Sequence, residues 1–178
     1  MSYCEFTKDL PHEHLDRQYH DMEYGFPVIN DNELFGRLIL EINQAGLSWS
    51  TILKKASNFR EAYDQFSVEK IARYTDHDVD RLMSNSGIIR NRRKITSVIY
   101  NARVVKEIQQ ERGSFENWLD DKKSLSLDAW VAIFRARFKF IGEKIIDEFL
   151  MSTSYKLGAH NKSCPIYDKV LKSGPKWL

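Results

Sequence analysis

The sequence predicts an all-α protein that folds as a single domain over residues 1–178. Apolar residues recur at helical spacing, no stretch shows the alternation of a half-buried strand, and neither a repeat nor a low-complexity linker divides the chain. A length of 178 residues with 42% apolar and 12% aromatic residues is enough for one substantial core. These features are typical of a helical domain with short connections.

The first predicted helix begins near Asn32, within a run of three residues that can cap a helix N-terminus. Leu34, Leu38 and Ile42 then follow at the spacing of one helix face. Four short helices are predicted next, at residues 50–56, 58–66, 68–74 and 78–84.

The strongest helical pattern covers residues 92–112, where apolar residues keep i, i+3, i+4, i+7 spacing for about five turns before Gly113. Two further helices are predicted at residues 115–119 and 128–151, and the second contains a candidate break near residues 140–142. The tail after Ser152 is predicted to be irregular.

Composition and charge restrict the class of protein. The net charge of +2 and the pI near 8.4 create no global field that would draw the chain onto nucleic acid or an anionic membrane, so any anion site must be local. No apolar run reaches the length of a membrane span, and the first residues lack the apolar block of a signal peptide, so we expect a cytoplasmic protein. Cys4 and Cys164 lie at opposite ends of the chain and form no disulfide framework. Free thiols are the ordinary interpretation, and metal ligands are the alternative.

Residues 84–95, with the sequence SNSGIIRNRRKI, place four cations where a helix begins. Positive charge is unfavourable at the positive end of a helix dipole, so stability alone does not explain this position. The helices at 78–85 and 92–112, joined at Gly87, form a helix-hairpin-helix whose free amides can bind a phosphate. The alternative is a solvated turn with a charged rim. The predicted contacts to a DNA backbone are Gly87, Ile89, Arg90, Arg92, Arg93 and Lys94.

Glu41 follows Leu34 and Leu38 on the same apolar stripe, which faces the core or a cleft. The segment QAGLSW comes next, and a turn at Gly46 would bring Trp49 toward the end of that helix. An acid beside an aromatic side chain is typical of a binding site for a flat, electron-poor ring. The alternative is that Glu41 lies in water or in an ion pair and that Trp49 is core.

Four motifs in register resemble the bacterial DNA-3-methyladenine glycosylase I family. The order and spacing of these motifs extend the resemblance from Cys4 to Cys164, which is nearly the whole chain. The motifs are YHDMEYG at residues 19–25, QAGLSW at 44–49, GIIR with KI at 87–95, and FKFIG at 138–142.

The resemblance implies a monofunctional base-excision repair enzyme of the helix-hairpin-helix superfamily. Such an enzyme flips a damaged adenine out of duplex DNA and hydrolyses its glycosidic bond, which releases free 3-methyladenine. By the resemblance, Glu41 recognises the base and is the catalytic candidate, Trp49 stacks on the base, and Tyr19 completes the pocket. Monomeric action is also implied.

The resemblance further implies a structural zinc ion bound by Cys4, His20, His160 and Cys164. Two cysteines and two histidines are an ordinary tetrahedral zinc set, and the spacing of His160 and Cys164 fits such a site. The ion would join segments 4–20 and 160–164 and, with no open coordination position, would stabilise the fold.

Three positions depart from the family pattern. Tyr24 and Phe6 stand where tryptophan is expected, and Asp16 stands where an aromatic residue is expected. These departures leave an alternative function open, that of a catalytically altered, zinc-stabilised protein that binds damaged DNA. Lesion range, catalytic rate and the residue that fills the gap left by the flipped base do not follow from the sequence.

Overall fold

The computed structural model describes residues 2–178, which form eleven α-helices and one 3-10 helix and contain no β-strand. The all-α prediction is therefore confirmed. The first half of the chain forms α1 (Tyr3–Thr7), α2 (Leu15–Met22), α3 (Asp31–Gln44), α4 (Trp49–Ala62), the 3-10 helix Asp64–Phe66, α5 (Val68–Ile71) and α6 (Asp76–Ser84). The second half forms α7 (Arg92–Arg112), α8 (Phe115–Asp120), α9 (Leu127–Arg137), α10 (Glu143–Ser152) and α11 (Tyr167–Lys172).

Several predicted boundaries agree with the structure. Helix α7 has the predicted bounds, and α3 begins at Asp31 because the side chain of Asn30 accepts hydrogen bonds from the first amides of the helix. The break expected near residues 140–142 separates α9 from α10. At this break Phe140 takes a φ of 60°, a left-handed conformation that a helix cannot contain.

Other predicted boundaries were wrong. The two helices expected at 50–56 and 58–66 are the single helix α4, followed by a 3-10 turn. Ile52 and Phe59 lie seven residues apart on one face of α4 and are both completely buried, so packing carries the helix through the weak helix formers Ser57 and Asn58. Helices α1, α2 and α11 were not predicted, and the tail after Ser152 is therefore not wholly irregular.

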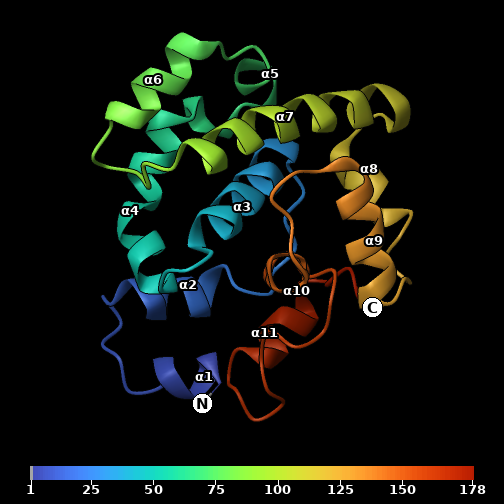
Figure 1. The fold of residues 1–178 in the computed structure, drawn as a ribbon. Coiled ribbons are helices and arrows are strands. Elements are labelled where there is room, and N and C mark those ends of the chain that lie inside the picture. The colour runs from blue at the N-terminus through green and yellow to red at the C-terminus, as the bar shows by residue number, and fades with distance from the viewer. Residues whose placement is uncertain (1) are drawn as a thin grey trace.

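Helix α3 lies at the centre of the molecule (Figure 1), with α4 beside it and α7 crossing over it. Its apolar stripe is completely buried and consists of Leu34, Phe35, Leu38, Ile39 and Ile42. Gly36 on the same helix allows the closest approach, because a β-carbon there would stand 2.3 Å from the ring of Phe66. A single contiguous hydrophobic cluster extends from this stripe through α7, α9 and α10.

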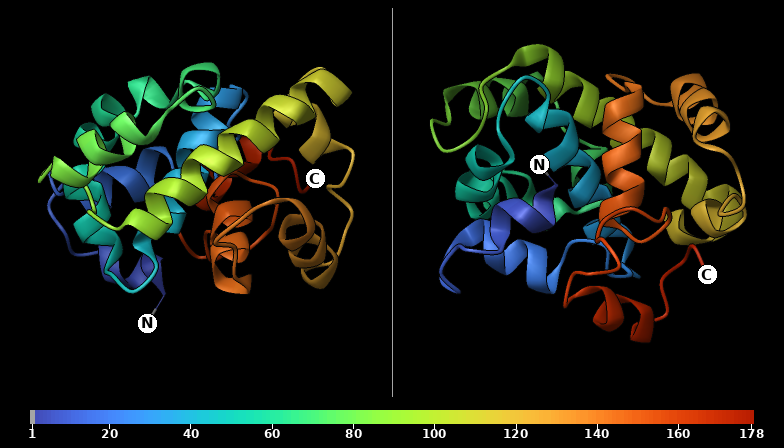
Figure 2. Two further views of the ribbon diagram at one scale, coloured as in Figure 1. Left: turned by 45° about the horizontal axis from the view of Figure 1, so that its top comes forward. Right: turned by 90° about the horizontal axis from the view of Figure 1, so that it is seen from below.

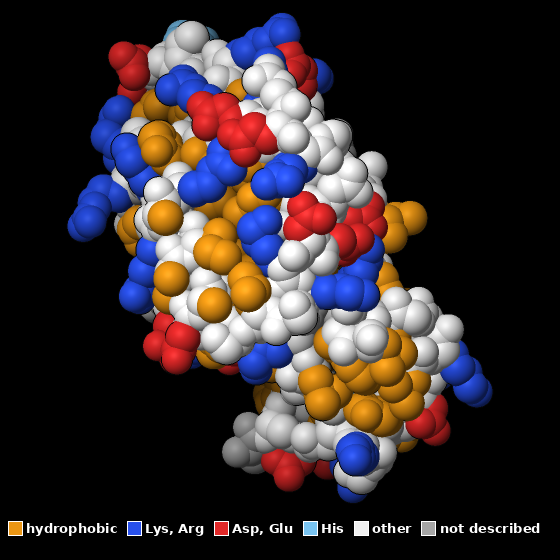
Figure 3. Space-filling model, turned by 90° about the vertical axis from the view of Figure 1, so that its right-hand side faces the viewer, with side chains coloured by type: hydrophobic (Ala, Val, Ile, Leu, Met, Phe, Trp, Pro, Cys, Tyr) orange, Lys and Arg blue, Asp and Glu red, His pale blue; other side chains and the backbone are white. Residues whose placement is uncertain are grey.

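The N- and C-termini themselves lie apart in Figure 1 and in Figure 2, with the C-terminus near α9, but helix α1 and the segment before α11 lie side by side below α3 in Figure 1. Hydrogen bonds connect them, since the Asn161 amide donates to Ser2 Oγ over 3.2 Å. Figure 3 shows cationic and anionic side chains intermingled on another face, in keeping with the near-balanced charge. None of the helices within residues 2–178 is long and apolar enough to cross a membrane.

Candidate active site

A cavity of about 320 Å³ opens between the central helix α3 and the two ends of the chain. Helices α1, α2, α4 and α10 and the loop at residues 158–161 supply the rest of its wall. The lining residues are Ser2, Tyr3, Cys4, Tyr19, Tyr24, Glu41, Gln44, Trp49, Lys144, Glu148, Gly158, Ala159 and Asn161. The three residues predicted to form a base pocket, Tyr19, Glu41 and Trp49, therefore lie together.

Glu41 is nearly buried, with 4% of its surface exposed, and yet its carboxylate has no hydrogen bond or ion pair within residues 2–178. Loss of hydration and, after it, the negative charge of Glu148 raise the pKa of Glu41 to about 8, whereas Arg37 and Lys144 oppose the change. A buried carboxyl group without a partner is costly. A ligand that donates hydrogen bonds or carries positive charge would remove that cost.

Two aromatic rings stand beside this carboxylate. The ring centroids of Tyr19 and Trp49 are 5.1 Å apart with an interplanar angle of 53°, so the rings form a corner rather than a stack. Arg37 fixes Tyr19 by donating a hydrogen bond of 2.5 Å to its hydroxyl while lying 4.9 Å from its ring centroid. The indole N–H of Trp49 is buried and has no acceptor within residues 2–178.

The sequence between Glu41 and Trp49 sets their relative position. Helix α3 ends at Gln44, and Gly46 takes a φ of 84°, which confirms the predicted turn. Ser48 then caps α4 by accepting a hydrogen bond from Thr51 N over 3.2 Å, which places Trp49 in the first turn of α4.

Lys94 supports this turn from the hairpin. Its ammonium group donates to the carbonyls of Asn43 over 2.9 Å and Ala45 over 2.8 Å, and only 5% of its surface is exposed. The cation thus compensates the free carbonyls at the C-terminus of α3. The predicted contact of Lys94 to a DNA backbone stays a prediction, and in this structure its ammonium group is turned inward to these two carbonyls.

Four of the other hairpin residues offer hydrogen-bond donors of two kinds. Arg90, Arg92 and Arg93 are exposed, and Arg92 forms an ion pair of 2.8 Å with Asp80 on α6. The backbone amides of Ile89 and Arg90 make no hydrogen bond within the described part of the chain, so they remain available as donors. These exposed cations and free amides together could hold a phosphate.

Gly87 has a different role from the one expected. Its φ is not in the positive range, and its amide donates to Asn85 Oδ1 over 2.8 Å. A β-carbon at this position would stand 3.1 Å from Asn58 on α4. The glycine therefore allows close packing of the hairpin against α4 rather than a left-handed turn.

The three departures from the family pattern have unequal consequences. Tyr24 lines the cavity and keeps its wall aromatic, whereas Phe6 stacks on Tyr3 from outside with a centroid distance of 6.1 Å. Asp16 is buried outside the cavity wall, where it accepts a hydrogen bond of 3.1 Å from the Tyr3 hydroxyl. Its charge therefore does not enter the pocket directly.

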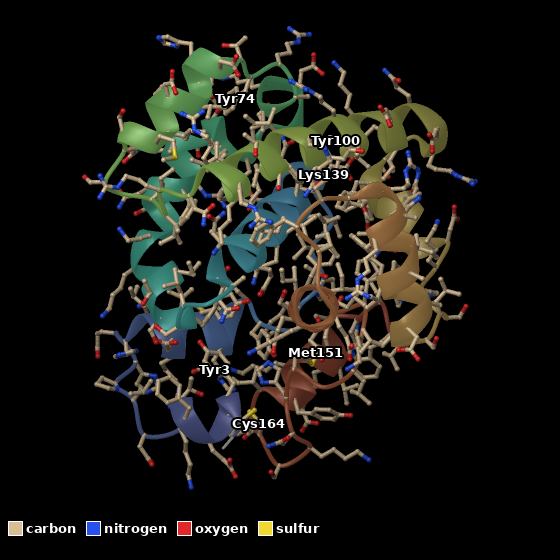
Figure 4. The ribbon with its side chains drawn as sticks, in the orientation of Figure 1. Tyr3, Tyr74, Tyr100, Lys139, Met151 and Cys164 are labelled. Atoms are coloured by element: carbon tan, nitrogen blue, oxygen red, sulfur yellow. The ribbon has the colours of Figure 1, made fainter. Side chains whose placement is uncertain are left out.

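The four predicted metal ligands come together between the chain ends, and Figure 4 shows Cys164 there, at the foot of the molecule. Their donor atoms all lie within 4.8 Å of one another. Cys164 Sγ lies 3.7 Å from His20 Nε2 and from His160 Nδ1, and Cys4 Sγ lies 3.8 Å from His160 Nδ1. Ligands bound at about 2.0–2.3 Å in a tetrahedron have similar separations, so the set fits a metal ion.

The second nitrogen of each histidine is already occupied. His20 Nδ1 lies 2.7 Å from Asp21 Oδ1, and His160 Nε2 lies 2.7 Å from the carbonyl oxygen of Tyr24. If each of these nitrogens carries the proton, the nitrogen that faces the cysteines is left unprotonated, as metal coordination requires.

Sequence reasoning did not identify several residues of the cavity, among them Tyr3, Lys144 and Glu148. Tyr3 belongs to the unpredicted helix α1, while Lys144 and Glu148 lie four residues apart on α10. Their spacing shows that the last two share a helix face. It does not show that this face meets α3, because that depends on the packing of α10.

Comparisons with known proteins agree with the cavity and the fold. The sequence profile of methyladenine glycosylase matches residues 10–129. A DNA-3-methyladenine glycosylase of Haemophilus influenzae is 34% identical over 166 residues, which cover 83% of this chain and 89% of the relative. DNA-3-methyladenine glycosylase 1 of Escherichia coli is 43% identical over 119 residues, which cover 67% of this chain and 62% of the relative.

Solved structures show the same relationship. The 3-methyladenine DNA glycosylase I of Staphylococcus aureus has a TM-score of 0.81 at 31% identity, over 92% of this chain and 95% of the other. A variant of 3-methyladenine DNA glycosylase I in complex with 3-methyladenine has a TM-score of 0.82 at 31% identity, over 93% of this chain and 97% of the other. The chain belongs to the methyladenine glycosylase family.

Proposed function

We propose that this protein is a monofunctional DNA glycosylase of base-excision repair that releases 3-methyladenine from alkylated duplex DNA. The observation that carries the proposal is the unpaired carboxylate of Glu41 beside the rings of Tyr19 and Trp49 in a cavity of about 320 Å³. A single base flipped out of the duplex would meet an acid on one side and aromatic surfaces on the others.

Methylation at N3 gives the adenine of a nucleotide a positive charge, and this charge makes it different from normal bases. Glu41 accepts a hydrogen bond from the exocyclic amine and stabilises the cation, which supplies the missing partner of its carboxylate. Normal adenine offers the amine without the charge. Selection of the lesion then comes from electrostatics together with shape.

The same charge simplifies the chemistry. A cationic purine is a good leaving group, so the glycosidic bond breaks with little need for protonation by a general acid. The pocket contributes by holding the departing base, and stacking on Trp49 adds about 1–3 kcal/mol. Water completes the hydrolysis at the sugar carbon.

The hairpin between α6 and α7 holds the DNA. The free amides of Ile89 and Arg90, with the side chains of Arg90 and Arg93, bind phosphate oxygens without reading sequence. Lys94 supports this arrangement from within, because it joins the first turn of α7 to the end of α3, the helix that carries Glu41.

The metal site has a structural role, and zinc is the ion that fits it best. Two thiolates and two imidazoles match the ligand preference of Zn²⁺, and a fourfold protein ligand set leaves no position for a reacting water. Cys4, His20, His160 and Cys164 would join the two chain ends, which both line the cavity. The ion supplies folding free energy.

Chromatography of the bases released from methylated duplex DNA tests the function. We expect the wild-type protein to release 3-methyladenine and both Glu41→Gln and Trp49→Ala to reduce the second-order rate about tenfold or more, while Trp49→Phe retains most of it. Absence of release by folded wild-type protein that binds DNA would instead support a damage-binding protein. The structure gives this alternative function little support, since Asp16 lies outside the cavity wall and Tyr24 preserves an aromatic surface.

A further inference from the structure

Helix α10 brings a second carboxylate to the cavity. Glu148 lines the same wall as Glu41, and Lys144 lies one helical turn before it. Desolvation raises the pKa of Glu148, as expected for an acid that is partly withdrawn from water. The cavity therefore has two acids and one lysine.

Only one oxygen of Glu148 is engaged by the protein. Tyr24 donates a hydrogen bond from its hydroxyl to Glu148 Oε2 over 3.2 Å. Neither the other oxygen nor the ammonium of Lys144 forms a hydrogen bond or ion pair within residues 2–178, although the i, i+4 spacing would allow the two side chains to meet. Glu148 thus keeps acceptor capacity that faces the cavity.

The hydrogen bond from Tyr24 also orients the carboxylate. Tyr24 is nearly buried and lies 5.7 Å from Tyr19 between ring centroids, so it forms part of the aromatic wall. A rigid aromatic hydroxyl therefore fixes one oxygen of Glu148 at the cavity wall, and the other oxygen has no partner within residues 2–178. Such an arrangement is typical of an acceptor held ready for a ligand.

We infer that Glu148 is a second base-recognition residue, which with Glu41 makes the cavity selective for purines that carry a positive charge. The inference rests on the proposed function and specifies its substrate class. Glu41 accepts a hydrogen bond from the exocyclic amine. Glu148 attracts the positively charged ring from the side of the cavity that α10 forms. Neutral lesions of similar shape would gain little from the second acid.

Two small ligands separate charge from shape. The neutral 9-methyladenine and its N3-methylated cation differ by a single methyl group and one positive charge, and calorimetry measures the dissociation constant of each at a pH above 8. Glu148→Gln keeps the size of the side chain and the acceptor for Tyr24. We expect it to weaken binding of the cation about tenfold or more and to change binding of the neutral base less than about threefold.

Asp147 provides a matched control on the same helix. It forms an ion pair of 2.8 Å with Lys156 and does not line the cavity, so Asp147→Asn removes one negative charge beside Glu148 without altering the wall. We expect this variant to keep the wild-type ratio of the two dissociation constants. Equal weakening of both ligands by Glu148→Gln, or an equal effect of Asp147→Asn on the cation, would overturn the inference.

Base release from methylated DNA distinguishes this inference from the proposed function. If the wild-type protein releases 3-methyladenine and Glu148→Gln does so at the same second-order rate with the same ligand ratio, only the role of Glu148 fails. If the wild-type protein releases no base, the proposed function fails, and the inference that rests on it falls too. If Glu148→Gln lowers both the second-order rate of base release and the preference for the cation over the neutral base, the proposed function and the role of Glu148 are both supported.

Discussion

Replacing Glu41 with glutamine should stabilise the free protein at alkaline pH although it weakens base release. The carboxylate is nearly buried and has no partner within residues 2–178, so its ionisation in the folded state is opposed by lost hydration and by Glu148. Glutamine has almost the same shape and no charge. The substitution therefore removes a cost that the folded protein bears only when no cationic ligand is bound.

The magnitude follows from the pKa of Glu41, which is about 8 in the folded protein against an ordinary value of 4.5. At about 1.4 kcal/mol per pH unit, the difference between these two pKa values limits the free-energy cost of the ionised carboxylate to roughly 5 kcal/mol. The amide of glutamine also lacks partners in the cavity and costs about 1–3 kcal/mol. We therefore expect Glu41→Gln to raise the free energy of unfolding above pH 8 by no more than about 2–4 kcal/mol.

The sign of the pH dependence is fixed by the direction of the shift. Between about pH 4.5 and 8 the folded state keeps the proton on Glu41 that the unfolded state has lost, so wild-type stability falls as pH rises. The contribution is fully present below pH 4.5 and is lost once pH passes about 8. The advantage of Glu41→Gln should therefore grow across this window and then level off.

Urea denaturation of both proteins at several pH values from 5 to 9 measures the difference. Glu13→Gln is the control, because Glu13 is exposed and outside the cavity. We expect the control to follow the wild-type curve. A Glu41→Gln protein that is no more stable than wild type above pH 8, or whose advantage does not change with pH, would refute the argument that this acid is buried without a partner.

Three further outcomes are expected. Lys94→Met should lower the free energy of unfolding in urea by about 2–4 kcal/mol, because two charge-assisted hydrogen bonds are lost. An unchanged urea midpoint would contradict the stabilising role of Lys94 at the end of α3. Arg90→Gln with Arg93→Gln should reduce the slope of log affinity for DNA against log salt by about 2, as measured by anisotropy; an unchanged slope would exclude phosphate contacts. A chelator should lower the melting temperature of the wild-type protein but hardly that of Cys164→Ser, unless the cluster binds no metal.

The sequence predicted those features whose cause is local. Helix α7 has its predicted bounds because its apolar pattern and the flanking residues Asn91 and Gly113 all agree on where it begins and ends. Glu41 was identified because a charged residue interrupts the apolar stripe of α3, and such an interruption is visible without knowledge of the partners.

Features that depend on packing between distant segments were not predictable in this way. Glu148 and Lys144 share a face of α10, but only the packing of α10 against α3 turns that face toward the cavity. Lys94 looked like a phosphate ligand because it follows three arginines. Its inward direction depends on the carbonyls at the end of α3, which lie about fifty positions earlier in the chain.

The same long-range packing joins the pocket to the hairpin. Helix α3 carries Glu41 in its last turns and ends on the carbonyls that accept from Lys94, so α7 is bonded directly to the turn before Trp49. The acids of the cavity, by contrast, have few internal partners to hold them. Carboxylates that lack internal partners gain them from a ligand that donates hydrogen bonds or carries positive charge. Stability and recognition therefore oppose each other at Glu41, whereas the buried Lys94 stabilises the end of the helix that carries this acid.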